Sequence, residues 1–226
     1  MSALILAAVV VELFTSQGCS SCPPADRLVS ELVKQHGQVI PLAFHVDYWD
    51  NASWRDPFSS HQWTERQLMY AQSFKLNGAY TPQMVVNGSS QFVGSNAAAM
   101  NAAVDDASRA KPAGSVSLDA TRKGATIEAT IRADAPPNSD IVLVVFENGI
   151  STAIHGGENS GRSAVDDAIV RKLWRIKAGN VSIPISASWK NIGVAVFLQD
   201  RTTLAIGPAA PAVILSEAKD LKLHTP

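Results

Sequence analysis

Cys19 and Cys22 are the only two cysteines among the 226 residues, and two serines separate them. Thiol–disulfide exchange needs a thiolate that attacks and a second thiol close enough to resolve the mixed disulfide. The Cys-x-x-Cys spacing meets both needs, whereas a secreted disulfide scaffold would carry several cysteines at scattered positions. The sequence therefore predicts a redox-active pair, with Cys19 as the nucleophile and Cys22 as the resolving thiol.

The segments on either side of the cysteines are expected to place the pair at the start of a helix. Residues 9–14 form a short apolar run that is typical of a strand covered on both faces. Pro23 and Pro24 are tolerated in a first helical turn, and apolar residues then recur at helical spacing. Backbone amides and the helix dipole favour an anion there, so we expect the pKa of the Cys19 thiol to fall below its free value of about 8.5.

A Cys-x-x-Cys pair can also be half of a zinc site. Zinc takes four ligands, and the chain has no second cysteine pair, so His45 and His61 would have to complete the site. We favour the redox interpretation, and we predict neither a metal site nor a dissociable cofactor. A binding module that uses the pair structurally, or for copper or zinc, stays the alternative hypothesis.

Three further polar residues lie near the pair in the sequence. Asp47 follows the strand predicted at residues 39–46, where sites of α/β proteins usually form; it could relay protons to Cys22, or it could cap the loop. His45 alternates with apolar neighbours, so it fits a buried, hydrogen-bonded histidine as well as a functional one. Asp26, one helical turn after Cys22, is interpreted as a carboxylate that favours the helix dipole.

The rest of the first half continues the alternation of helices and strands. The spacing of its aromatic residues predicts a helix over residues 60–76. Residues 83–86 and 91–93 are expected to form a hairpin around Asn87-Gly88, and another helix follows. The other aromatic side chains of residues 49–70 are interpreted mainly as packing.

The second half of the chain changes character, because six apolar segments alternate there with turns rich in glycine, proline and asparagine. This spacing indicates an antiparallel sandwich. Its charged loop is interpreted as solvated and comprises Glu158, Arg162, Asp166 and Asp167. The predicted fold is an α/β thioredoxin-like N-terminal domain followed by an all-β antiparallel sandwich-like C-terminal domain, with boundaries at residues 1–112, 113–208 and, for a C-terminal tail, 209–226.

Two segments carry a resemblance to known proteins: residues 12–26, Glu-Leu-Phe-Thr-Ser-Gln-Gly-Cys-Ser-Ser-Cys-Pro-Pro-Ala-Asp, and residues 45–50, His-Val-Asp-Tyr-Trp-Asp. They resemble the thioredoxin superfamily and, more closely, the bacterial domain-of-unknown-function family 1223, often labelled secreted. The resemblance implies a cis bond between Thr81 and Pro82, beside the cysteines, whose backbone could pair with a substrate strand. It also implies a periplasmic or secreted location, although the N-terminus lacks the basic region of a signal peptide.

Composition excludes several classes of partner. The formal net charge is −1 and no basic run occurs, so we expect no nucleic-acid partner. No stretch of about 20 apolar residues is present, so we expect no membrane span. The sequence leaves the oligomeric state open. The leading hypothesis is a thiol–disulfide oxidoreductase whose partner is a protein or small-molecule thiol or disulfide.

Overall fold

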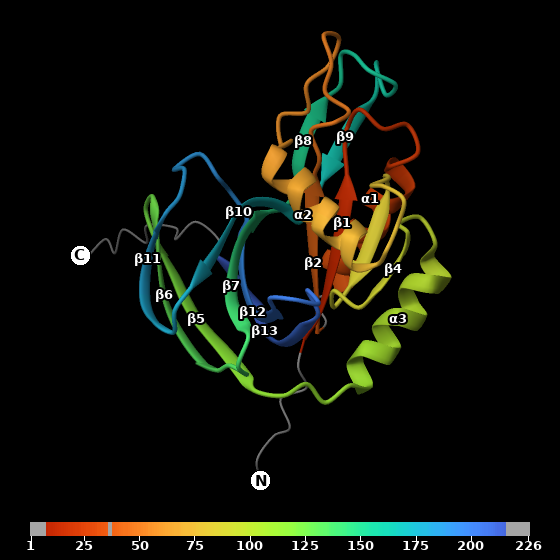
Figure 1. Ribbon diagram of the computed structural model, residues 1–226. Helices are drawn as coiled ribbons and strands as arrows, with labels where there is room; N and C mark the ends of the chain where they lie inside the picture. The colour runs from red at the N-terminus through yellow and green to blue at the C-terminus, as the bar shows by residue number, and fades with distance from the viewer. Residues whose placement is uncertain (1–7, 36–37, 216–226) are drawn as a thin grey trace, which may run out of the picture.

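The computed structural model describes residues 8–35 and 38–215. Strands account for most of its regular elements (Figure 1). The helices are α1 (Pro23–Gln35), α2 (His61–Ser73) and α3 (Ala97–Arg109). The strands are β1 (Val9–Thr15), β2 (Val39–His45), β3 (Gln83–Val86), β4 (Ser90–Val93), β5 (Ser115–Lys123), β6 (Thr126–Asp134), β7 (Ser139–Glu147), β8 (Ile150–Ala153), β9 (Ser163–Asp166), β10 (Ile169–Ile176), β11 (Gly179–Pro184), β12 (Ile192–Asp200) and β13 (Ile206–Leu215).

One curled, mixed sheet of eight strands runs through both halves of the chain, in the order β13-β12-β7-β10-β2-β1-β3-β4. Strands β1 and β2 pair in parallel, and β10 joins the free edge of β2, also in parallel. At that junction Ile169 pairs with Ala43, and the Ala43 amide donates to the carbonyl of Ala168 over 2.7 Å.

The predicted combination of an α/β thioredoxin-like domain and a separate sandwich-like domain is therefore wrong. Strand β2 is buried along nearly its whole length, so its outer edge carries backbone donors and acceptors that need partners. Strand β10 supplies them and fuses the two predicted sheets into one. The boundary near residue 112 stays a prediction.

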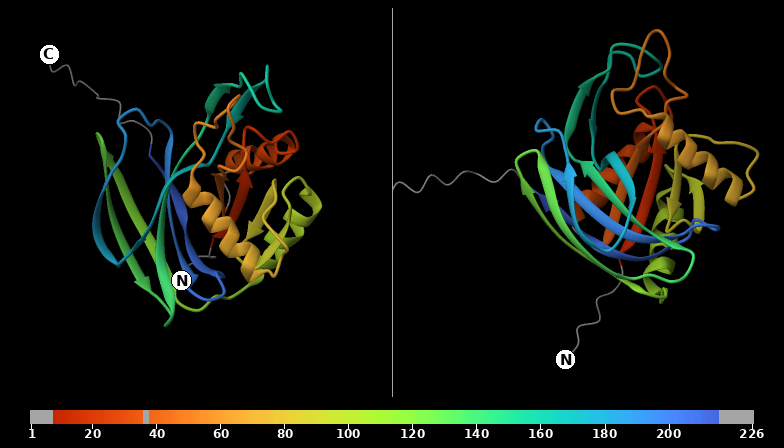
Figure 2. Two further views of the ribbon diagram at one scale, coloured as in Figure 1. Left: turned by 45° about the horizontal axis from the view of Figure 1, so that its top comes forward. Right: turned by 60° about the vertical axis from the view of Figure 1, so that its left-hand side comes forward.

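A second sheet, β11-β6-β5, packs on the part of the large sheet formed by β7, β12 and β13. Figure 2 shows these two layers side by side. Ile127 and Ile131 point from the small sheet into a shared core with Val145, Val194 and Val196. The second half thus contains two packed sheets, but one of them is part of the larger sheet, so the predicted separate sandwich does not form.

Helices α1 and α2 cover opposite faces of β1. The Phe14 ring packs against Tyr70 of α2, with ring centroids 6.0 Å apart. The adjacent Leu13 points the other way, toward the Gly94 region that Ala25 of α1 also contacts. Because successive side chains of a strand alternate between faces, the apolar β1 is buried between the two helices, as its composition predicted.

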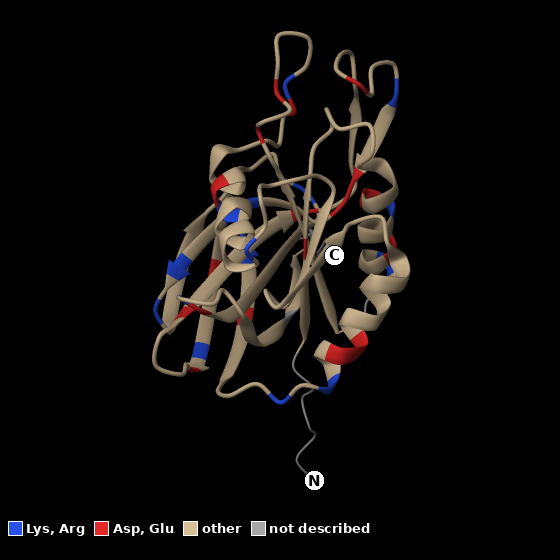
Figure 3. Cartoon of the chain, turned by 45° about the vertical axis from the view of Figure 1, so that its right-hand side comes forward, with Lys and Arg blue, Asp and Glu red and all other residues tan. Residues whose placement is uncertain are grey.

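Several local predictions are confirmed. Helix α2 lies within the predicted residues 60–76, and β3 and β4 form the predicted hairpin, in which Asn87 and Gly88 both have positive φ. Strand β13 extends to Leu215, so the first residues of the predicted tail lie in the sheet, and residues 216–226 lie outside the described residues. Within the described part of the chain, no helix is both long and apolar enough to cross a membrane. Acidic and basic residues are interspersed along the ribbon (Figure 3).

Candidate functional site

The cysteine pair lies between the end of β1 and the start of α1. Cys19 and Cys22 form a disulfide, with Cα atoms 5.4 Å apart. The Cys22 amide donates to the Cys19 carbonyl over 3.2 Å, and α1 begins at the next residue, Pro23. Both cysteines are fully buried, whereas Ser20 and Ser21 between them are exposed. The proximity of the two cysteines and their position at a helix start are as predicted.

Thr81 lies directly beside Cys19, and Pro82 follows it. The Thr81–Pro82 peptide bond is cis. The Thr81 hydroxyl donates to Cys19 Sγ over 3.3 Å and accepts a hydrogen bond from Trp49 Nε1 over 2.8 Å. Trp49 Cβ would also lie 3.1 Å from a Cβ on Gly18. The loop after β2 therefore contacts both Thr81 and the residue before Cys19. The role of Thr81 and Pro82 in substrate binding stays a prediction.

A buried ion pair supports the turn that precedes Cys19. His45 Nδ1 lies 2.8 Å from Asp56 Oδ2, which also accepts the Gln17 amide over 2.8 Å. Burial lowers the pKa of the His45 imidazole, but the Asp56 carboxylate outweighs burial and raises this pKa to about 9. Burial alone would raise the pKa of Asp56, but the charge of His45 outweighs burial, so the pKa of Asp56 is lowered. Of the two interpretations that the sequence allowed for His45, the structure therefore fits the buried, hydrogen-bonded histidine.

Asp26 is the carboxyl group of α1 that follows Cys22 by one turn. Its Oδ1 accepts the Thr15 hydroxyl over 2.7 Å, and its amide donates to the Cys22 carbonyl over 3.2 Å. Burial is the main cause that raises the pKa of Asp26 to about 7; the hydrogen bond from Thr15 opposes it, and the charge of Asp166 adds to it. A carboxyl group that titrates near neutral pH can both donate and accept a proton. The sequence interpretation of Asp26 as a carboxylate that favours the helix dipole did not include this property.

The predicted relay residue, Asp47, has different neighbours. Its Oδ1 accepts the Thr64 hydroxyl over 2.5 Å, and its Oδ2 lies 3.1 Å from His61 Nδ1. Burial raises the pKa of Asp47, but the hydrogen bonds from Thr64 and His61 outweigh it and lower the pKa below its usual value. Among the described residues, Asp47 forms no hydrogen bond with either cysteine, so the contacts resemble those of a loop cap.

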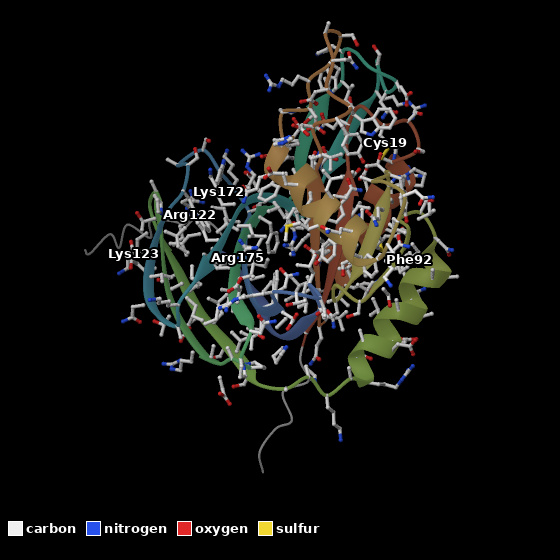
Figure 4. All side chains as sticks on the ribbon, in the orientation of Figure 1. Cys19, Phe92, Arg122, Lys123, Lys172 and Arg175 are labelled. Atoms are coloured by element: carbon white, nitrogen blue, oxygen red, sulfur yellow. A yellow bond between two sulfur atoms is a disulfide. The ribbon has the colours of Figure 1, made fainter. Side chains whose placement is uncertain are left out.

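The segment that joins β8 to β9 crosses over the cysteine motif from the second half of the chain. Asn159 Nδ2 donates to the carbonyls of Gln17 and Cys19, over 3.0 and 2.9 Å. Glu158 Oε2 accepts both the Ser20 amide, over 3.0 Å, and the Ser20 hydroxyl, over 2.7 Å. Figures 1 and 2 show this segment beside the loop after β2 at one end of the molecule, and Figure 4 labels Cys19 near it.

The interpretation of this segment as solvated charge is wrong for Asp166, which is buried and accepts Gln17 Nε2 over 2.7 Å. Glu158 is exposed, as expected, but it also binds Ser20. Burial raises the pKa of Asp166. The glycines of the segment carried a usable signal, because a Cβ on Gly156 would lie only 1.8 Å from the carbonyl oxygen of Ser53. Such a close approach of two backbones tolerates only glycine.

Strands β8 and β9 pair as an antiparallel hairpin, and a pocket of about 480 Å³ lies between α1 and this β8–β9 hairpin. The cysteine sulfurs do not line it, so it is a neighbour of the disulfide and not its entrance. Gln17 Oε1 is buried and has no hydrogen-bond partner among the described residues. The lining residues are Ser16, Gln17, Pro23, Asp26, Arg27, Ser30, Lys34, Ile154, Asn159, Arg162, Ser163, Ala164, Val165, Asp166 and Asp167. Across the described ranges, no group of three or more His, Cys, Asp or Glu side chains is arranged to hold a metal ion.

Residues 10–199 match the model of a family described as a protein of unknown function, DUF1223. The chain belongs to the DUF1223 family. This match confirms the resemblance seen in the cysteine and Tyr-Trp-Asp segments, and it spans the cysteine motif, Thr81, Pro82 and the β8–β9 hairpin of the DUF1223 chain. The wider resemblance to the thioredoxin superfamily stays a prediction.

The DUF1223 chain is similar to the X-ray crystal structure of a protein from Agrobacterium tumefaciens. The two are 27% identical with a TM-score of 0.70, over 97% of this chain and 99% of the other. A protein of the DUF3823 family from Parabacteroides merdae aligns over 45% of this chain and 51% of its own, with 14% identity and a TM-score of 0.26. No curated protein matches the chain.

Proposed function

We propose that this protein is a thiol–disulfide oxidoreductase that acts through Cys19 and Cys22. The observation that carries the proposal is the disulfide itself, which lies at the start of α1 with the Thr81 hydroxyl directed at Cys19 Sγ. The dipole at the start of a helix favours a negative charge, such as that of a thiolate. The hydroxyl of Thr81 donates directly to Cys19 Sγ, so Cys19 is the better stabilised of the two leaving groups.

In the direction that oxidises a substrate, the protein reacts from its disulfide form. A substrate thiolate attacks Cys19 Sγ, the Cys19–Cys22 bond breaks, and its electron pair passes to Cys22 Sγ, which takes up a proton. A second substrate thiolate then attacks the substrate sulfur of the mixed disulfide and releases Cys19 as a thiolate. Two substrate thiols become one disulfide, and the disulfide of the protein becomes a dithiol.

Asp26 is the residue that we propose to exchange the proton with Cys22. It follows Cys22 by one helical turn, and its pKa of about 7 gives both protonation states at neutral pH. Asp47, the residue favoured by the sequence, is a weaker candidate because its contacts with Thr64 and His61 hold it ionised. A carboxylate that stays ionised cannot supply the proton that Cys22 needs.

The full burial of both cysteines favours a second candidate function, a binding module in which the disulfide is structural. In that case the pair would stabilise the turn between β1 and α1 and would not exchange with thiols. The two functions differ in reduction potential, because structural disulfides of secreted proteins typically lie below about −300 mV and catalytic pairs lie above it.

The deciding experiment equilibrates the purified protein in glutathione and dithiothreitol redox buffers and counts free thiols by alkylation and mass spectrometry. We expect a reversible two-electron couple above about −300 mV. In addition, Cys22→Ser should retain a mixed disulfide with a thiol substrate, whereas Cys19→Ser should not, and the double variant is the control. A pair that stays oxidised until the protein unfolds would support the structural function.

We further propose a periplasmic or secreted location and a protein or small-molecule thiol as partner. Disulfides persist in oxidising compartments, and the family resemblance points the same way. Fractionation of the native host followed by trapping of free thiols at lysis tests the proposal: the pair should be recovered oxidised, and outside the cytoplasm.

A further inference from the structure

We propose that Glu158 disfavours the thiolate form of Cys19 and thereby makes the cysteine pair a stronger reductant. The inference depends on the proposed function. It assigns a specific role to a residue that lies 139 positions after Cys19 in the sequence and reaches the motif from the segment between β8 and β9.

The carboxylate of Glu158 binds the residue next to Cys19. Its Oε2 atom accepts the backbone amide of Ser20 over 3.0 Å and the Ser20 hydroxyl over 2.7 Å. Ser20 directly follows Cys19, so its amide is a backbone donor beside the residue that carries the sulfur. Glu158 therefore occupies this donor and brings a negative charge to the residue next to Cys19.

Contacts of other residues hold the segment that carries Glu158 in place. The neighbouring Asn159 is buried and donates to the Cys19 carbonyl over 2.9 Å and to the Gln17 carbonyl over 3.0 Å. Arg162 Nη1 donates in turn to Asn159 Oδ1 over 3.2 Å. Asn159 thus holds the backbone that carries Glu158, and neutralising Glu158 should leave the segment docked.

Like charges disfavour each other, so Glu158 disfavours the thiolate relative to the thiol and to the disulfide. A less stable thiolate makes the reduced protein less stable, which lowers the reduction potential. The effect depends on pH, because only the thiolate form of the reduced protein is affected. The hydrogen bonds from Ser20 lower the pKa of Glu158, so its charge is constant above about pH 5.5.

Other charged groups that face the motif come from each neighbouring element. They are Asp26 on α1, His45 on β2 with Asp56 of the following loop, Asp166 on β9, and Arg162 between β8 and β9. A Glu158→Gln substitution alters none of them, so a comparison with the wild type cancels their contributions. Glutamine also keeps an oxygen that can accept the Ser20 amide.

The test measures the pKa of Cys19 in the reduced protein, from the pH dependence of its alkylation rate, together with the reduction potential at pH 5.5 and at pH 9. In Glu158→Gln we expect the Cys19 pKa to fall by about 0.5–1, which is a three- to tenfold gain in thiolate stability. The potentials of variant and wild type should agree at pH 5.5 and separate at pH 9 by about 15–30 mV, with the variant the higher. Salt at 1 M should remove most of the difference, because it shortens the screening length to about 3 Å.

Glu31→Gln is the matched control, since it removes an exposed carboxylate from α1 without touching the motif. An unchanged Cys19 pKa in Glu158→Gln, or an equal change in Glu31→Gln, would overturn the inference. A difference in potential that is the same at both pH values would also overturn it, because a structural effect has no reason to follow the thiolate. Failure of the proposed function gives a different result: the wild type shows no reversible couple, while alkylation of the reduced protein still reports on Glu158.

Discussion

Replacement of Asp26 by asparagine should stabilise the protein, and the gain should depend on pH. The pKa of Asp26 is raised from 3.8 to about 7. Each pKa unit corresponds to about 1.4 kcal/mol, so full burial would make the ionised form about 4 kcal/mol less favourable in the folded state. Because the residue is only half-buried, solvent screening reduces this to about 2–3 kcal/mol.

The sign follows from the proton count of each state. Below about pH 4, Asp26 is protonated in both the folded and the unfolded protein, and it contributes no pH dependence. Between about pH 4 and pH 7 the unfolded state loses its proton and the folded state keeps it, so the wild type loses stability as the pH rises. Asparagine has no proton to lose, and it can still accept the Thr15 hydroxyl that Asp26 accepts.

Urea unfolding of the oxidised protein between pH 4 and pH 8.5 measures this effect. Relative to the wild type, Asp26→Asn should gain about 2–3 kcal/mol over that range, mostly below pH 7. Asp47→Asn is a control of opposite sign, because the lowered pKa of Asp47 means that its ionised form stabilises the fold at neutral pH and stops doing so on acidification. Parallel stability curves for the wild type and Asp26→Asn would refute the assignment of a neutral-pH proton exchanger to Asp26.

Two further substitutions test the framework around the disulfide. His45→Gln should destabilise the fold by about 3–5 kcal/mol, because it leaves the buried Asp56 carboxylate without its charged partner. In the wild type, the contribution of charged His45 to the free energy of unfolding should be fully present below about pH 6.5 and lost as the pH rises through about 9. Denaturant unfolding over this pH range measures it. Gly156→Ala should displace the β8–β9 hairpin, since its Cβ would lie 1.8 Å from a backbone oxygen, whereas Gly78→Ala meets nothing within 4 Å. Limited proteolysis should cut the hairpin in the first variant only, and equal resistance of both would contradict the close approach.

The features that the sequence predicted well are encoded by neighbouring residues. A helix start after Cys22 follows from the prolines and the apolar spacing that comes after them, and α1 begins at Pro23. The Asn87-Gly88 turn specifies a hairpin because both residues accept positive φ, and β3 and β4 flank it. In each case the chemistry of a few consecutive residues decides the structure.

The arrangement of the strands could not be predicted in the same way. Strand β10 joins β2 through backbone hydrogen bonds, and its side chains would be equally apolar at the edge of a separate sandwich. Backbone pairing between distant strands leaves no periodic signal in either one. Strands β8 and β9 are short and partly polar, so their sequences lack the apolar pattern that predicts a strand. They lack it because their hairpin packs on the cysteine motif and not in the main core.

The same contacts explain why the candidate site cannot be understood from the first half alone. Gln17 reaches both halves: its amide donates to Asp56 and its Nε2 atom donates to Asp166. Asn159 binds the carbonyl groups of Gln17 and Cys19 on either side of the turn. A fragment ending at residue 112 would lose Asp166 and Asn159 and would expose the edge of β2. The hydrogen bonds that hold the turn before Cys19 therefore come in part from the β-rich half of the chain.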